Sequence, residues 1–137
     1  MKPVDGFAWI DRWPHPSVAT PESGGFAMKN FGAALDLAKR GAVDAICFTP
    51  FNKQALKLAG NPYRDEIHWA ADRLGYEGRC SEYNLLDGLW NCRVTSHIPL
   101  KDVSAHITGD RIIQALTLAD RCMRQAGYAR PRIAVAA

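Results

Sequence analysis

A short apolar segment at 43–48, V-D-A-I-C-F, most constrains the fold, because it follows a stretch with helical periodicity and precedes another. Its nearly continuous apolar character is typical of a buried parallel strand. The preceding stretch, 26–40, places Phe31, Leu35 and Ala38 at i, i+4 and i+7, as in an amphipathic helix. A helix followed by a buried strand predicts an α/β fold.

Two shorter helices are predicted beyond this segment. Asn52 can cap a helix that begins near Lys53 and ends at Gly60. After the Asn-Pro turn, residues 63–74 form a second amphipathic pattern that ends at Gly75. The helical segments therefore flank the predicted strand on both sides in the sequence.

A β-hairpin is predicted next. The runs 81–86 and 89–96 are joined by Asp-Gly, a strong signal for a two-residue hairpin turn. The second run would deliver His97 to a strand end, and Pro99 prevents the ladder from simply continuing. From the residues alone, a single imidazole lacks the partners that make a metal site, so a ligand role is not favoured there.

The C-terminal part is predicted to be a long helix and a final strand. Thr108 can cap a helix that runs to Ala126, with one apolar stripe that a sheet face would cover. The stripe consists of Ile112, Leu116, Ala119, Met123 and Ala126. Residues 132–137, R-I-A-V-A-A, read as a strand that enters the sheet.

Length and composition predict one domain or one large piece of a domain. Residues 1–25 are expected to be an irregular N-terminal segment, because four prolines and several glycines interrupt it, and 26–137 to be the α/β body. The 17 basic and 14 acidic residues are interspersed, which argues against nucleic-acid binding. No apolar run approaches the roughly 20 residues that span a bilayer, and the start lacks a signal-peptide pattern. We therefore expect a cytoplasmic protein without membrane partners.

The four cysteines are widely spaced and form no C-x-x-C motif. This spacing argues against a zinc knuckle or a redox dithiol and favours buried or half-buried free thiols. They are Cys47, Cys80, Cys92 and Cys122.

Three segments together resemble the PdxA family, the 4-hydroxythreonine-4-phosphate dehydrogenases and their four-carbon sugar-acid phosphate relatives. They read T-P-F-N-K-Q-A-L-K-L-A-G at 49–60, R-V-T-S-H-I-P-L-K-D-V at 93–103 and A-R-P-R-I-A-V-A-A at 129–137. The resemblance begins at about Phe26 and covers the middle of a family member. It implies a partial isocitrate/isopropylmalate-dehydrogenase-like α/β fold, with helices packed on a mixed sheet with a β-hairpin, and a homodimer with its active site between subunits.

The resemblance also implies site residues. The metal-binding histidine of the family lies in T-T-H-[IL]-P-L-[KR]-D, which places that role on His97 in T-S-H-I-P-L-K-D. Lys53 is a candidate for the substrate's anionic groups. The family's substrate-binding G-H-T-E aligns with Asp-Glu-Ile-His, so Glu66 and Ile67 replace the usual His and Thr. Either the substrate differs, or His68 has taken over the imidazole's role.

The implied activity is an NAD- and divalent-metal-dependent oxidation, with decarboxylation, of a phosphorylated hydroxy acid. Candidate substrates are 4-hydroxythreonine 4-phosphate, as in pyridoxal phosphate biosynthesis, and threonate or erythronate 4-phosphate; the metal would be zinc, magnesium or cobalt. The resemblance assigns no catalytic or NAD-binding residue in this chain.

The family's N-P-H-A-G-E, D-Q-G-H/L-type and G-D-P-x-G-I-G segments have no counterpart here. We therefore expect a truncated or excised fragment that is inactive in isolation. The alternative is a non-catalytic α/β small-anion-binding or dimerisation module, which the Glu66-Ile67 departure favours.

Overall fold

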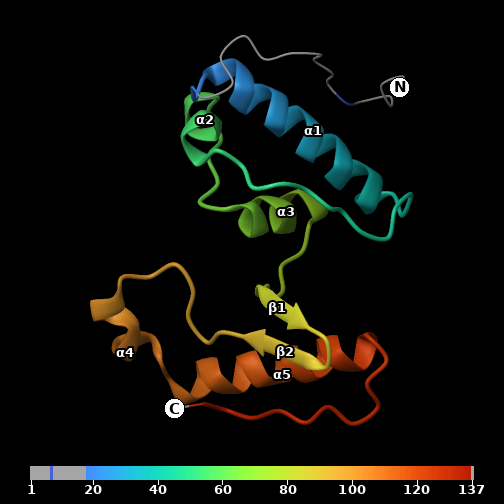
Figure 1. The fold of residues 1–137 in the computed structure, drawn as a ribbon, viewed down its shortest axis with the longest axis vertical. Helices are drawn as coiled ribbons and strands as arrows, with labels where there is room; N and C mark the ends of the chain where they lie inside the picture. The colour runs from blue at the N-terminus through green and yellow to red at the C-terminus, as the bar shows by residue number, and fades with distance from the viewer. Residues whose placement is uncertain (1–6, 8–17, 137) are drawn as a thin grey trace. The chain divides into compact units, whose positions relative to one another are not determined.

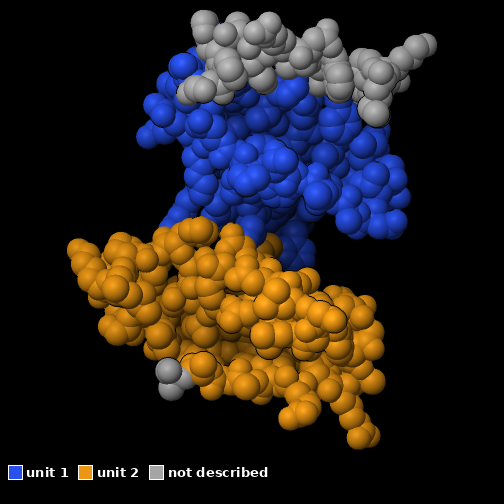
Figure 2. All heavy atoms as spheres, viewed as in Figure 1, with its two compact units in different colours: residues 1–77 blue, residues 78–137 orange. Residues whose placement is uncertain are grey.

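The computed structural model describes residue 7 and residues 18–136, and the chain divides into two compact units, 1–77 and 78–137 (Figure 2). The first unit holds helices α1, α2 and α3 (Figure 1). The second holds strands β1 and β2, the 3-10 helix η1, and helices α4 and α5. Most of the segment predicted to be irregular, 1–25, lies outside the described residues.

Helix α1 (Pro21–Lys39) begins before the predicted start at Phe26. The Thr20 side chain accepts a hydrogen bond from the Ser23 backbone N–H (3.1 Å), and the Ser23 hydroxyl accepts one from the Thr20 N–H (3.2 Å). Pro21 suits the first helical position because its missing N–H would have no partner there anyway. Residues 21–25 are thus helical, and a domain boundary at residue 25 stays a prediction.

Helices α1 and α2 (Lys53–Leu58) touch at their backbones. A Cβ atom added to Gly24 would lie 2.0 Å from the Ala55 carbonyl oxygen, so only glycine permits this approach. The predicted cap of α2 is confirmed, because Asn52 Oδ1 accepts a hydrogen bond from the Ala55 N–H (3.0 Å). Helix α3 (Glu66–Leu74) is capped by Asp65 and ends, as predicted, at Gly75, with φ 70°.

The core of the first unit joins all three helices through four buried side chains, Phe31, Leu35, Leu56 and Trp69. The Phe31 ring lies at its centre. Its centroid is 4.9 Å from that of Phe48, 5.2 Å from that of Phe51 and 5.0 Å from that of Trp69. Rings at these separations and inclined angles add favourable edge contacts to the apolar burial.

The predicted strand at 43–48 is not formed among the described residues. The segment runs as irregular chain between α1 and α2 (Figure 1), and Val43 and Phe48 are exposed. A strand exists only when a neighbour pairs with its backbone, and no described segment pairs with this one. Apolar composition alone therefore predicted the wrong local structure.

The predicted hairpin is confirmed in the second unit. Strands β1 (Tyr83–Leu86) and β2 (Leu89–Cys92) are antiparallel, and Gly88 has φ 71° in the turn. The register pairs Tyr83 with Cys92 and Leu86 with Leu89. Strand β2 ends before the predicted limit at Ser96, so His97 lies five residues beyond its end.

Helix α5 (Gly109–Gln125) confirms the predicted long helix and its Thr108 cap. It buries Ala115, Leu118 and Ala119, whereas the predicted stripe shares only Ala119 with this set. Two short helical turns, η1 (Leu100–Asp102) and α4 (Val103–His106), precede it. Arg79 connects α5 to the segment after β2, donating to Gln114 Oε1 (3.0 Å) and to the Val94 carbonyl (3.3 Å).

The predicted C-terminal strand is also absent from the described residues, since 132–136 form no ladder. The described sheet is the two-stranded antiparallel hairpin, so the prediction of a mixed sheet is wrong for this part of the chain. The combination of helices with a small sheet agrees with the predicted α/β class. Within the described ranges, no helix combines the length and apolar character needed to cross a membrane.

Candidate functional site

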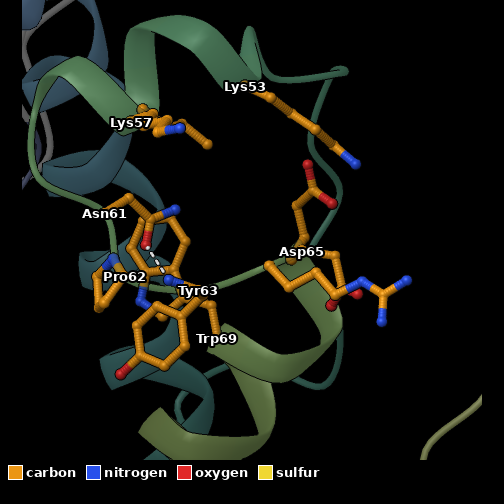
Figure 3. Close-up of a pocket in the computed structure, with 10 residues that line it drawn as sticks. Lys53, Lys57, Asn61, Pro62, Tyr63, Asp65 and Trp69 are labelled. Atoms are coloured by element: carbon orange, nitrogen blue, oxygen red, sulfur yellow. Dashed lines mark hydrogen bonds between the residues drawn. The ribbon is translucent and has the colours of Figure 1, made fainter. Parts of the chain in front are cut away.

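A cavity of about 340 Å³ in the first unit is lined by two of the four predicted substrate residues, Lys53 and Glu66 (Figure 3). Leu56 and Trp69, both buried, contribute its apolar lining. Lys53 and Lys57 extend from α2 on one side of the cavity, with Tyr63 and Trp69 on the other (Figure 3). The cavity therefore combines an apolar surface with cationic groups that suit a small anion.

The wall made by the 61–63 turn is held by local contacts. Asn61 Oδ1 accepts a hydrogen bond from the Tyr63 N–H (3.2 Å), and the Tyr63 ring stacks on Trp69 with centroids 6.0 Å apart. The Tyr63 hydroxyl hydrogen-bonds Asp72, which raises the pKa of Tyr63 above its ordinary value. These contacts connect the turn to α3 and fix this side of the cavity.

The start of α3 decides which predicted side chains reach the cavity. Glu66 and the cap residue Asp65 line it together with Arg64, whereas Ile67 and His68 are not among its lining residues. His68 instead turns back on Asp65, with Nδ1 2.5 Å from Asp65 Oδ1, and its side chain is 66% exposed. The structure thus brings Lys53 and Glu66 to one cavity and leaves Ile67 and His68 outside it.

His97 belongs to the second unit and lies between β2 and η1. Its φ is +56°, so among the residues that the structure describes it is the one non-glycine residue with a left-handed backbone conformation. His97 Nε2 lies 3.5 Å from Glu82 Oε1, and an Arg93 guanidinium nitrogen lies 2.6 Å from the other oxygen, Glu82 Oε2. The expected imidazole is therefore half exposed and stands beside a carboxylate.

The donor set at His97 fits a divalent metal in part. An imidazole nitrogen and a carboxylate oxygen are both common metal donors. Over residue 7 and residues 18–136, however, no group of three or more His, Cys, Asp or Glu side chains could hold a metal. The four cysteines are free thiols, as predicted, and none joins such a group among the described residues. Cys92 and Cys122 are half-buried as expected, but Cys47 and Cys80 are exposed, so the predicted burial is wrong for these two.

Several site residues escaped the sequence-based prediction. Lys57 lies one helical turn after Lys53, so the spacing alone could have paired them. Glu82 and Arg93 flank the hairpin one position outside the Tyr83–Cys92 pair, so the two-residue turn already implied that they face each other. Arg64, which lies outside any helix or strand, carried no comparable signal.

Comparison with known proteins identifies similar chains. The family model described as "Pyridoxal phosphate biosynthetic protein PdxA" matches residues 4–137. A Rhizobium meliloti (strain 1021) protein with a provisional 4-hydroxythreonine-4-phosphate dehydrogenase name is 50% identical over 118 residues, covering 86% of this chain and 34% of that protein. The D-threonate 4-phosphate dehydrogenase of Salmonella typhimurium (strain LT2) is 33% identical over 115 residues, which cover 84% of this chain and 35% of that protein.

A solved structure gives the same match. The 4-hydroxythreonine-4-phosphate dehydrogenase from Klebsiella pneumoniae aligns with a TM-score of 0.75 at 32% identity. The alignment covers 85% of this chain and 35% of that structure. The chain therefore spans about a third of the length of the relatives it matches.

Proposed function

This chain belongs to the PdxA family, and on that premise we propose that it forms part of the active site of an NAD- and divalent-metal-dependent dehydrogenase. The substrate would be a phosphorylated hydroxy acid, such as 4-hydroxythreonine 4-phosphate or threonate or erythronate 4-phosphate, which is oxidised and then decarboxylated. In the full-length protein this part would belong to an isocitrate/isopropylmalate-dehydrogenase-like subunit of a homodimer.

The observation that carries the proposal is the cavity between α2 and α3. Lys53, Lys57 and Arg64 line it and can donate charge-assisted hydrogen bonds to a phosphate or carboxylate. The buried side chains of Leu56 and Trp69 supply the apolar part of its lining. Such a cavity suits a small molecule with one strongly anionic end.

Glu66 would meet the other end of the substrate. An ionised carboxylate only accepts hydrogen bonds, so it selects hydroxyl or ammonium groups and repels a second anion. Ile67 and His68 are not among the lining residues, so the proposal assigns neither of them a direct role in this cavity. The Glu66 carboxylate would therefore orient the hydroxylated carbons, and the cationic wall would hold the phosphate.

His97 would supply one metal ligand. When bound, the metal would polarise the substrate hydroxyl and NAD would accept the hydride. At least one further ligand would come from outside the described residues, since these hold no group of three candidate donors. We accordingly expect no measurable turnover from the 137-residue chain by itself.

The test is an NMR titration of the isotopically labelled chain with D-threonate 4-phosphate, and separately with inorganic phosphate. We expect both ligands to shift the resonances of residues around Lys53, and Lys53→Ala to weaken binding of both. Lys101→Ala, an exposed lysine in the second unit, is the matched control and should bind as the parent chain does.

The two ligands separate the candidate functions. Tighter binding of the sugar-acid phosphate, weakened by Glu66→Gln, would support the substrate site. Equal binding of both ligands would favour a non-catalytic anion-binding module. An unchanged spectrum with either ligand would contradict the proposed substrate site. NAD-linked turnover by the isolated chain would instead overturn the expectation that it is inactive alone.

A further inference from the structure

The geometry of the hairpin places a carboxylate beside His97. Continuing the β1–β2 register by one position sets Glu82 opposite Arg93, and the two side chains form an ion pair at 2.6 Å. This contact occupies Glu82 Oε2 and orients the carboxylate. The second oxygen, Oε1, is thereby turned toward the imidazole of His97.

The separation between Glu82 Oε1 and His97 Nε2 is informative. At 3.5 Å it exceeds the usual 2.7–3.2 Å of a hydrogen bond to nitrogen. Two donor atoms that each lie about 2.1 Å from a tetrahedral metal ion are separated by about 3.4 Å. The pair is therefore spaced as two ligands of one ion would be.

A second histidine–carboxylate pair provides an internal contrast. His68 Nδ1 and Asp65 Oδ1 are 2.5 Å apart, which is a direct, short hydrogen bond. At that separation, one ion could bind both atoms only with an angle well below a right angle. The two pairs have similar chemistry, but only the Glu82–His97 pair leaves room for an ion.

The backbone and the exposure of the pair are consistent with a binding role. His97 holds φ +56°, a conformation that non-glycine residues adopt at a cost and that often marks functional positions. The side chains of His97 and Glu82 are 46% and 36% exposed, so an ion can enter with part of its water shell. Arg93 then plays the part of the outer hydrogen-bond donor that orients a ligating carboxylate.

We propose that Glu82 is a second protein ligand beside His97 and that the pair binds one divalent cation. Mixed nitrogen and oxygen donors suit Mn²⁺, Co²⁺ or Zn²⁺. The inference deepens the proposed function, because it rests on the ligand role of His97. It assigns part of the metal site to the hairpin itself, at a position that no sequence motif indicated.

The test uses Mn²⁺ as the probe and the imidazole resonances of the whole chain as the readout. Mn²⁺ broadens signals close to its site, so even weak binding is measurable. We expect the His97 signal to broaden selectively and saturably, and the His68 signal to stay sharp at the same Mn²⁺ concentration. Glu82→Gln should weaken the apparent affinity at His97 by roughly tenfold or more.

Two further variants separate ligation from simple attraction. Glu82→Asp keeps the charge but withdraws the carboxylate by one methylene. If Glu82 is a ligand, Mn²⁺ binding should weaken; if it only attracts the cation electrostatically, the affinity should not change. Glu77→Gln removes an exposed carboxylate elsewhere and is the matched control. An amide spectrum of each variant verifies that the hairpin is intact.

The outcomes distinguish this inference from the proposed function. If His97→Ala abolishes the broadening and Glu82→Gln leaves it unchanged, Glu82 is not a ligand while the metal role of His97 stands. If Mn²⁺ causes no selective broadening at His97 in the parent chain, both the ligand pair and the metal role proposed for His97 are overturned.

Discussion

The two units are stabilised in different ways. In the first, three helices meet around large side chains, with Phe31 at the centre and Leu35 almost fully buried. In the second, the buried residues are Ala115, Leu118 and Ala119, while the hairpin leucines Leu85, Leu86 and Leu89 are exposed. The second unit therefore relies more on backbone pairing and on polar contacts such as those of Arg79.

This difference affects the two candidate binding regions. Two core residues, Leu56 and Trp69, line the cavity of the first unit, so the packing that stabilises the helices also fixes this part of its wall. Glu82 and His97 instead lie outside the two hairpin strands and are half exposed, and Glu82 contacts both Arg93 and His97. Surface ion pairs are weak and are screened by salt. We therefore expect salt to affect the His97 region more than the cavity.

The largest effect should come from Gly24→Ala, which tests whether backbone contact defines the first unit. The new Cβ would meet the Ala55 carbonyl oxygen at 2.0 Å, so α1 and α2 must separate. We expect a loss of about 3 kcal/mol or more in the free energy of unfolding, measured with urea. Gly25→Ala is the control, because its Cβ meets nothing within 4 Å and should be neutral or stabilising. Equal effects of both substitutions would contradict the close approach.

A pair of leucine truncations compares the two cores directly. Leu35→Ala should destabilise the first unit by about 3 kcal/mol, because Leu35 is 1% exposed and contributes to the large cluster. Leu118→Ala, at 7% exposed among small neighbours, should cost about 2 kcal/mol. Amide hydrogen exchange, read separately for each unit, measures both. A larger loss from Leu118→Ala would reverse the comparison.

High pH should weaken the second unit through Tyr83. Burial raises the pKa of Tyr83 to about 12, with the nearby Cys122 thiol adding to the shift. A raised pKa in the folded state means that the tyrosine's stabilising effect is present below about pH 10 and is lost as the pH rises toward 12. Urea midpoints at pH 9 and pH 11.5 should differ, and Tyr83→Phe should reduce the difference. An unaltered difference in the variant would show that another group is responsible.

The smallest effect is expected at the Asp36–Arg73 pair on the surface of the first unit. Hydrogen bonds from the Arg73 guanidinium, at 2.8 and 2.7 Å, hold the pKa of Asp36 below its ordinary value. A lowered pKa in the folded state contributes stability above the ordinary value, and this contribution disappears as the pH falls through the folded pKa. Asp36→Asn should therefore be slightly destabilising at pH 7 and neutral at pH 2. Thermal unfolding at both pH values measures this.

Local signals in the sequence were sufficient for most of the helices and for the hairpin. Asn52 and Thr108 cap helices where their side chains predict, and the Asp-Gly pair forms the expected turn. Each of these structures is completed within a few residues, so nearby sequence contains the necessary information. Pro21 was assigned to the irregular N-terminal segment, whereas it is the first residue of α1. Proline is common both in irregular chain and at the first position of a helix, so the residue type alone does not distinguish the two.

Features that depend on distant partners could not be predicted in this way. The segments 43–48 and 132–136 have strand composition, but no described segment pairs with either. At the cavity, the resemblance indicated Lys53 and Glu66, and only the structure revealed that Lys57 and Arg64 join them. The orientation of His68 likewise depends on its contact with Asp65, which the sequence did not indicate.

The left-handed backbone at residue 97 has a consequence for how this chain would respond to selection. Glycine adopts this conformation freely, whereas histidine does so at a cost of about 1 kcal/mol. A library screened for heat resistance should therefore enrich His97→Gly, and the metal role proposed for His97 predicts that the same library screened for metal retention would eliminate it. Selection for thermostability alone would thus replace His97 with glycine, because relief of backbone strain favours glycine at this position whereas the proposed metal binding requires the imidazole.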